Sequence, residues 1–156
     1  MALHAIRMWL HRQSFIEGSA PTLVRSAAME EHLEALSVSG SPLVWLHTSP
    51  EFALKRVLAT GLPRIYSITP CFRGEEHGPL ACVEFTMLGW YRTGGGYREV
   101  AQDLIALVAN VAAALGSELP RVDEMTWSTA FERFSGCAPP LDPVEAMRVW
   151  VNDIEP

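Results

Sequence analysis

Two short segments near opposite ends of the chain carry the residues best suited to bind a partner. Residues 5–10 and 146–151 share the order alanine, apolar, arginine, apolar, tryptophan, apolar. If both are strands, each arginine shares a face with its tryptophan, because side chains alternate between the faces of a strand. Tryptophan and arginine are enriched at binding hot spots. The predicted partner-binding residues are Arg7, Trp9, Arg148 and Trp150. The structural alternative is that the tryptophans lie under a helix and the arginines stack on them.

A glycine-rich loop is the second candidate site. Three consecutive glycines separate an expected strand from an expected helix, where backbone N–H groups and the helix dipole can hold an anion. The predicted anion-binding residues are Arg92, Gly94, Gly95, Gly96 and Arg98. The spacing matches neither the dinucleotide-binding pattern nor the P-loop. A plain hinge between strand and helix is therefore the alternative.

The sequence contains no pattern typical of a metal site or of a catalytic nucleophile. The five histidines and three cysteines lack the spacing of a zinc site, and no nucleophile elbow is present. We therefore predict no catalytic residue, no metal and no cofactor. Cys71 and Cys82 are equidistant from the middle of an expected hairpin tip, which leaves two interpretations open: a functional thiol pair, or two small apolar strand residues.

Length and composition favour one globular domain over residues 1–156. Apolar residues make up 49% of the chain and charged residues 19%, with a mean hydropathy of +0.12. The net charge of −6 and the pI of about 5.3 disfavour binding to nucleic acid or to an anionic membrane, and favour a basic protein partner. No long apolar run reads as a signal peptide or membrane span, so we expect a cytoplasmic protein. The oligomeric state is not predicted.

Periodicity predicts the elements that would position these residues. Val83, Phe85 and Met87 alternate with polar residues as in a half-buried strand. Ser49 and Gly61 frame a helix with a proline at its first position. The expected strands cover residues 4–12, 43–47, 64–72, 80–91 and 144–154, with a polar turn at 73–79. The expected helices cover residues 23–37, 50–60, 97–115 and a segment capped by Asp123 that contains 127–134.

These elements predict an α+β fold. We expect a mixed, mostly antiparallel sheet of about five strands with helices packed on one or both faces, in the order β-α-β-α-β-β-α-α-β. The unit from residue 80 to residue 115, a strand, a glycine hinge and an apolar helix, is the part on which the rest is expected to pack.

The sequence favours a non-enzymatic protein-binding domain. An acidic, tryptophan-containing domain without a catalytic signature is of the same type as inhibitor, immunity and adaptor proteins of bacteria, an analogy of type only. Its negative charge would speed the encounter with a basic partner. One alternative is a protein or enzyme that binds a small anionic metabolite in a pocket near residues 94–96. A second alternative is a subunit of a phage or secretion assembly.

Overall fold

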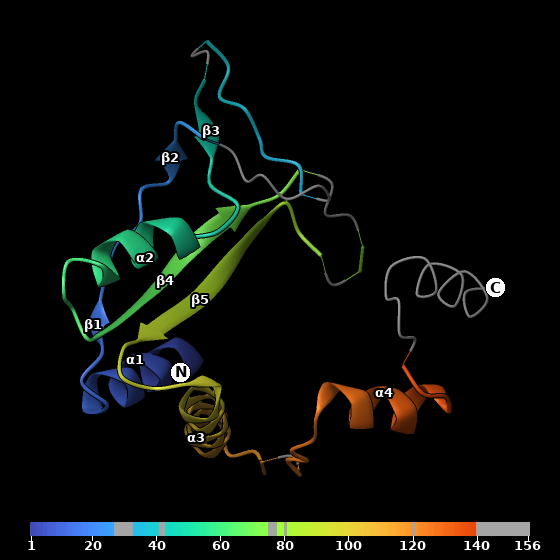
Figure 1. The fold of residues 1–156 in the computed structure, drawn as a ribbon. Helices are drawn as coiled ribbons and strands as arrows, with labels where there is room; N and C mark the ends of the chain where they lie inside the picture. Colours follow the sequence, from blue (N-terminus) through green and yellow to red (C-terminus); the bar gives the residue numbers. More distant parts are fainter. Residues whose placement is uncertain (27–32, 41–42, 75–77, 80, 120, 140–156) are drawn as a thin grey trace. The chain divides into compact units, whose positions relative to one another are not determined.

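The computed structural model describes residues 1–26, 33–40, 43–74, 78–79, 81–119 and 121–139. Contacts divide the chain into two compact units, residues 1–119 and 120–156. Unit 1 contains α1 (Ala2–Arg12), β1 (Ile16–Glu17), β2 (Leu23–Val24), β3 (Trp45–Leu46), α2 (Glu51–Leu58), β4 (Arg64–Phe72), β5 (Glu84–Arg92) and α3 (Tyr97–Leu115), all labelled in Figure 1. Unit 2 contains α4 (Trp127–Ser135). The prediction of a single domain over residues 1–156 stays a prediction.

A long hairpin is the centre of unit 1. Strands β4 and β5 pair antiparallel along their whole length, from Arg64 opposite Arg92 to Phe72 opposite Glu84. The short strand β1 pairs parallel with β4, which gives a three-stranded sheet in the order β1-β4-β5. Strands β2 and β3 form a separate two-stranded sheet.

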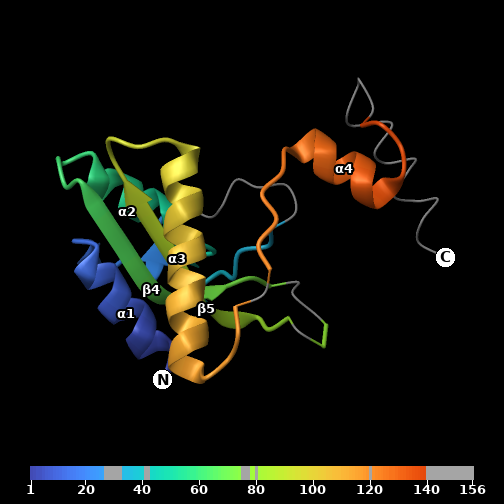
Figure 2. The same ribbon diagram turned by 90° about the horizontal axis from the view of Figure 1, so that it is seen from below.

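The two faces of the hairpin pack on different helices. Seen from below in Figure 2, α1 and α3 lie in front of β4 and β5, and α2 lies behind them. The buried cluster on the α1 and α3 side contains Trp9, Leu10, Phe15, Tyr66 and Leu107, with Ile68, Leu88 and Trp90 packed against it. These strand residues all have even numbers, so the odd-numbered residues of β4 and β5 face α2.

Helix α1 replaces the strand predicted at residues 4–12. Ala5, Trp9 and Leu10 are buried, which is the spacing of one helical face, whereas Met8 is 40% exposed. A strand would have buried Met8 together with Leu10. The prediction was wrong because a short segment can fit a period of 2 and a period of 3.6 at once, and here the helical period decides burial.

Several other elements confirm or correct the sequence-based predictions. The strand at 64–72 and the helix at 97–115 are confirmed as β4 and α3, and the predictions at 43–47, 50–60 and 80–91 contain β3, α2 and most of β5. The helix predicted from residue 23 is wrong, because Leu23 and Val24 form β2 and Ser37 bridges to Trp45. The predicted strand at 144–154 lies outside the described residues.

The predicted fold class is wrong. We expected an α+β domain with one sheet of about five strands in the order β-α-β-α-β-β-α-α-β, but the chain begins with a helix, and the strands of its described residues form one sheet of three and one of two. The first two predicted elements were both wrong: a strand was expected where α1 forms, and a helix was expected where β2 forms.

The hairpin register also corrects the expected cysteine position. Cys71 lies opposite Phe85, not Cys82, and the N–H of Arg73 donates to the carbonyl of Val83 at 2.9 Å. The turn is therefore not symmetric about its middle. Cys71 is buried, Cys82 is exposed, and neither forms a disulfide. The interpretation of Cys71 as a small buried strand residue agrees with this geometry.

Unit 2 is described by a single helix. The side-chain oxygen of Thr126 caps α4 by accepting from the N–H of Thr129 at 3.2 Å, so Thr126, and not Asp123, is the N-cap. Asp123 instead pairs with Arg133 at 3.2 Å. Gly136 ends the helix with φ of 76°, in the left-handed region that favours glycine.

Candidate functional site

The α2 side of the hairpin presents a partly open platform, which we call the hairpin face. It is formed by Ser67, Thr69 and Cys71 of β4 and by Phe85, Met87 and Gly89 of β5. One end lies under α2, because a Cβ added to Gly89 would come within 3.7 Å of Leu54 and 3.9 Å of Pro50. Toward the other end, Thr69, Phe85 and Met87 are only half-buried. A ligand can therefore reach this part of the face.

A guanidinium group lies at the open end of the hairpin face. The Cζ atom of Arg73 is 5.1 Å from the centroid of the Phe85 ring, in a cation–π arrangement. The backbone bond between Arg73 and Val83 fixes this residue at the point where the two strands separate. A planar cation stacked on an aromatic ring is suited to hold a phosphate or carboxylate.

A carboxylate marks the other end of the face, at the start of α2. The N–H of Glu51 donates to Ser49 Oγ at 3.2 Å, and its side chain pairs with Lys55 at 2.5 Å. Burial, together with the negative charge of Glu51, raises the pKa of Tyr91 on the neighbouring strand. Tyr91 and Phe85 are six residues apart on β5, or about 20 Å at the rise of an extended strand. The Glu51 carboxylate and the Arg73 guanidinium thus lie near opposite ends of β5.

His47 forms two hydrogen bonds with the edge of β4 that faces away from β5. Its Nε2 lies 2.7 Å from the carbonyl oxygen of Pro70, and its own carbonyl accepts from the N–H of Phe72 at 3.1 Å. His47 is buried. Because a carbonyl only accepts, Nε2 carries the proton. These bonds hold the part of β4 that leads to Arg73.

A polar cluster joins α1, β1 and β4 near the other end of the same edge of β4, where β1 pairs with it. The hydroxyl of Tyr66 lies 2.9 Å from Glu17 Oε2 and 2.9 Å from His11 Nε2. Arg7 Nε donates to Glu17 at 3.0 Å. Burial first, and then Glu17, raise the pKa of Tyr66 to about 12. Burial would raise the pKa of Glu17, but hydrogen bonds from Tyr66 and Arg7 outweigh it and lower that pKa.

A small hollow lies next to this cluster. Its volume is about 260 Å³, and it is lined by Glu17, Gly18, Ser19, Ser67, Ile68 and Thr69. It opens where β1 leaves β4, after the N–H of Gly18 has donated to the carbonyl of Tyr66 at 2.7 Å. The hollow therefore continues the hairpin face past the end of β1.

The predicted partner-binding residues are not brought together by the described structure. Trp9 is 9% exposed and belongs to the core cluster, so it offers no indole surface to a partner. Arg7 bonds Glu17 within the polar cluster. Arg148 and Trp150 lie outside the described residues. The pairing of the two chain ends stays an untested prediction.

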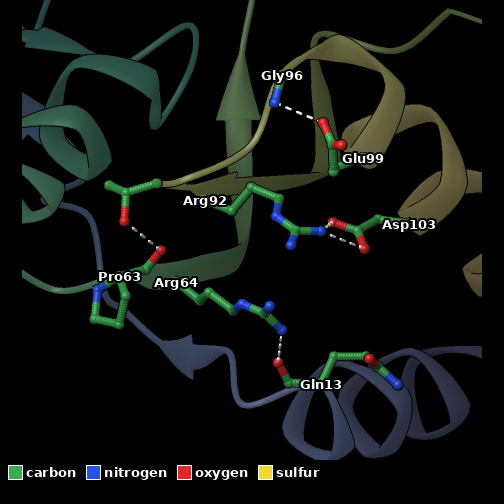
Figure 3. A network of polar contacts seen from close by, with 8 residues as sticks. Gln13, Pro63, Arg64, Arg92, Gly96, Glu99 and Asp103 are labelled. Atoms are coloured by element: carbon green, nitrogen blue, oxygen red, sulfur yellow. Dashed lines mark hydrogen bonds and ion pairs between the residues drawn. The ribbon is translucent and has the colours of Figure 1, made fainter.

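The glycine-rich loop is held by its own neighbours (Figure 3). Arg92 binds both carboxylate oxygens of Asp103 at 3.0 Å, and the N–H of Gly96 donates to Glu99 at 2.6 Å. The bond from Gly96 is the main cause of the lowered pKa of Glu99. Gly94 has φ of 69°, which explains a glycine at that position.

The remaining predicted loop residues lie close by. Arg98 contacts the hydroxyl of the adjacent Tyr97 at 3.3 Å, and a Cβ on Gly95 would come within 3.2 Å of Glu99. Two carboxylates of α3 thus already bind two of the groups expected to bind an anion, Nη1 of Arg92 and the N–H of Gly96. The geometry of the loop does not favour anion binding, which stays a prediction.

Arg73, Phe85 and Glu51 were not identified as site residues from the sequence. Arg73 was placed in a polar turn, and Glu51 was interpreted only as an acidic residue in the first turn of a helix. The sequence did contain one signal, the alternation of side chains along a strand. Cys71 and Arg73 are two residues apart, as are Phe85 and Met87, so the two members of each pair lie on the same face of a hairpin. Using that signal requires the register, which the sequence left open.

Within the described ranges, no three His, Cys, Asp or Glu side chains cluster as ligands of a metal ion. No helix there is both long and apolar enough to cross a bilayer.

Comparison with known proteins identifies what this chain is similar to. Residues 1–148 match the family of class II tRNA synthetases (D, K and N). The elongation factor P–(R)-β-lysine ligase of Vibrio atlanticus is 30% identical over 154 residues, covering 94% of this chain and 46% of that protein. The ligase of the same name from Pseudoalteromonas translucida is 34% identical over 157 residues, covering 92% of this chain and 44% of that protein. The chain thus spans about half the length of these curated relatives.

A solved structure shows the same fold. Asparaginyl-tRNA synthetase from Pyrococcus horikoshii, complexed with asparaginyl-adenylate, superposes with a TM-score of 0.63 at 23% identity. The match covers 72% of this chain and 26% of the synthetase. At this identity the likeness establishes the fold alone.

These comparisons overturn the predicted function. The expectation of a non-enzymatic immunity, inhibitor or adaptor protein is wrong, because the relatives are ligases and the matching family consists of tRNA synthetases. The alternatives of a metabolite pocket near residues 94–96 and of an assembly subunit are replaced by the same finding.

The predicted partners are corrected as well. We expected a basic protein and no nucleic acid, whereas the family is named for its action on tRNA and the curated relatives for ligation to elongation factor P. The net charge misled because it averages the whole surface, and a substrate meets only the local charge at its site.

Proposed function

Because this chain belongs to the class II tRNA synthetase family (D, K and N), we propose that it carries the adenylate-forming face of an amino-acid ligase. The proposed amino acid is (R)-β-lysine or a close analogue, and the proposed acceptor is elongation factor P. The observation that carries this proposal is identity of 30% and 34%, spread over more than nine-tenths of the chain, with two proteins named as such ligases.

The reaction has two steps. In the first, the carboxylate of the amino acid attacks the α-phosphorus of ATP, a new P–O bond forms, and pyrophosphate leaves. In the second, a nucleophile of the acceptor attacks the carbonyl carbon of the aminoacyl-adenylate, and AMP leaves. The first step needs a cation at the α-phosphate, where negative charge accumulates. The second needs the adenylate to be held until the acceptor arrives.

The hairpin face offers a group for the phosphate of such an adenylate. The Arg73 guanidinium is proposed to bind the phosphate, since it is held over Phe85 at 5.1 Å.

A cytoplasmic location belongs to the same proposal. The first step consumes ATP, and both a tRNA and elongation factor P are components of translation. The absence of a membrane-spanning helix among the described residues is in keeping with this location.

Binding of a non-reactive adenylate tests the proposal. We expect calorimetry to show that the chain binds the sulfamoyl analogue of (R)-β-lysyl-adenylate, and that R73A weakens this binding at least tenfold because one charge-assisted contact to the sulfamoyl group, which replaces the phosphate, is lost. R98A is the matched control, since Arg98 is exposed and contacts the adjacent Tyr97. Failure of the wild-type chain to bind the analogue would count against the proposal.

The acceptor is tested separately. Pre-formed β-lysyl-adenylate is offered to the chain with elongation factor P, or with a mixture of tRNAs, and transfer of labelled β-lysine is followed. We expect label on elongation factor P. Label on tRNA alone would leave the adenylate-forming face in place and overturn the choice of acceptor.

A further inference from the structure

The outer edge of β4, which faces away from β5, is defined by the register of the hairpin. The N–H of Arg73 donates to the carbonyl of Val83 at 2.9 Å, so odd-numbered residues exchange backbone bonds across the hairpin. In an antiparallel pair the residues between them point their N–H and C=O groups the other way. Both backbone groups of Ile68 therefore point to the outer edge of β4.

Ile68 occupies a gap between two paired stretches of this edge. On one side, the carbonyl of Tyr66 accepts from the N–H of Gly18 at 2.7 Å. On the other side, the carbonyl of Pro70 lies 2.7 Å from Nε2 of His47. Among the described residues, none bonds to the N–H or the C=O of Ile68. One donor and one acceptor are thus left side by side on the edge.

The hollow beside β1 lies at this gap. Its volume is about 260 Å³, and Ile68 lines it together with the hydroxyl-bearing residues Ser19, Ser67 and Thr69. A water molecule takes up about 30 Å³ in the liquid, so the hollow has room for more than one. Pockets for drug-sized ligands are larger, at about 300–1,000 Å³. The hollow therefore has the size of a small metabolite and a polar lining.

The two free groups of Ile68 match a single amino acid. A residue that paired with Ile68 in an antiparallel sheet would offer its own C=O to the N–H and its own N–H to the C=O. In that residue one carbon atom separates the nitrogen from the carbonyl carbon. A free α-amino acid has the same spacing between its ammonium nitrogen and its carboxylate carbon. A longer strand does not fit, because Gly18 and His47 already occupy the edge on either side.

We propose that the hollow binds a free α-amino acid as its zwitterion. The carboxylate accepts from the N–H of Ile68, and the ammonium donates to the carbonyl of the same residue. Hydroxyls of Ser19 and Thr69 can support either end, since a hydroxyl both donates and accepts. The Glu17 carboxylate also lines the hollow, so an ammonium is favoured there over a second anion.

This site is separate from the hairpin face and goes beyond the proposed function. The adenylate is proposed to lie against Arg73 and Phe85, whereas the groups of Ile68 point away from β5. The proposed substrate, (R)-β-lysine, has one more carbon between its nitrogen and its carboxylate than an α-amino acid has. It does not reproduce the spacing of one residue, so the hollow selects α-amino acids over that substrate.

Two isomers test the site directly. L-alanine and β-alanine contain the same atoms and differ by one carbon in the spacing of nitrogen and carboxylate. Each is titrated into the isotope-labelled 156-residue chain while amide NMR signals are followed. We expect L-alanine to produce saturable shifts at Ile68, Ser19 and Thr69, and β-alanine to bind at least tenfold more weakly.

A matched pair of proline variants tests the backbone contact. I68P removes the N–H that points into the hollow and leaves the bonds between β4 and β5, as the natural Pro70 does two residues later. It should weaken L-alanine binding at least tenfold. T86P removes an N–H on the opposite edge of the hairpin and should leave L-alanine binding unchanged. Circular dichroism spectra show whether both variants are folded.

The contrary results are specific. The proposal would be overturned by the absence of saturable shifts at Ile68, which would mean that water alone fills the hollow. Equal binding of the two isomers, or full binding by a folded I68P, would overturn it as well. If I68P does not fold, the comparison of the isomers on the wild-type chain decides alone. Failure of the adenylate analogue to bind would leave this inference standing, because the alanine titrations involve neither Arg73 nor Phe85.

Discussion

At the scale of single residues, the buried ion pair between Arg92 and Asp103 is the polar contact whose loss should lower the free energy of unfolding most. Both oxygens of Asp103 lie 3.0 Å from Arg92 Nη1, and the two side chains are only 15% and 11% exposed. The pair connects the end of β5 to the second turn of α3 (Figure 3). It thus fixes the direction in which α3 leaves the glycine loop.

Removing one member of this pair should destabilise the fold strongly. D103A leaves a largely buried guanidinium without its counter-ion, which costs about 3–5 kcal/mol in comparable sites. The free energy of unfolding in urea measures the effect. K55A, which breaks the exposed pair of Lys55 with Glu51, should leave the unfolding midpoint unchanged. Equal effects of the two substitutions would show that the Arg92–Asp103 pair is not buried as described.

Tyr66 should give the fold an alkaline limit. Its pKa is raised to about 12 in the folded chain, above the ordinary value of 10.0. The folded state therefore holds this proton more tightly than the unfolded state, so the contribution is fully present below pH 10 and is lost as pH rises toward 12. Unfolding free energies measured between pH 9 and about 11.5 should fall in the wild type.

The variant Y66F isolates that contribution. Phenylalanine cannot titrate, so the difference in unfolding free energy between wild type and Y66F should shrink as pH rises through this window. A difference that stays constant from pH 9 upward would contradict the hydrogen bonds of Tyr66 to Glu17 and His11.

At the scale of elements, α1 decides whether the described fold is correct. As a helix it buries Leu10 completely and leaves Met8 exposed, whereas a strand would treat both alike. L10A should lower the free energy of unfolding by about 2–5 kcal/mol through lost burial and a residual cavity. M8A should change it by less than about 0.5 kcal/mol, as surface substitutions usually do. Similar losses for both variants would contradict the helix.

Long elements were predictable from the sequence and short ones were not. β4 and α3 carry nine and 19 residues of consistent period, so a local pattern was enough to identify them. In α1, alternation of Ile6, Met8 and Leu10 agreed by coincidence with a strand. β1, β2 and β3 have two residues each and exist because of their neighbours, not because of their own pattern.

The candidate site could not be predicted because it depends on the hairpin register. A shift of three positions separates the expected partner of Cys71 from the observed one, and only the observed register places Arg73 against Phe85. Trp9 was expected on an open face because residues 4–12 were interpreted as a strand, yet in the helix α1 it lies in the core. A site depends on which few side chains meet, and that follows from the tertiary structure.

At the scale of the whole molecule, unit 1 is a sheet covered on one side and accessible on the other. α1 and α3 close one face, while α2 covers only the Gly89 end of the second (Figure 1). The accessible part carries Arg73 and Phe85, whereas Glu51, the first residue of α2, lies at the covered end. This asymmetry is what a face that receives a ligand requires.

The most direct test is to locate a bound adenylate on the chain. Amide and side-chain NMR signals of the isotope-labelled protein are followed as the sulfamoyl analogue of (R)-β-lysyl-adenylate is added. We predict that the largest shifts fall on Thr69, Arg73, Phe85 and Met87. Shifts confined to the glycine loop at residues 94–96, or no saturable shifts at all, would contradict the assignment of the hairpin face as the adenylate-binding site.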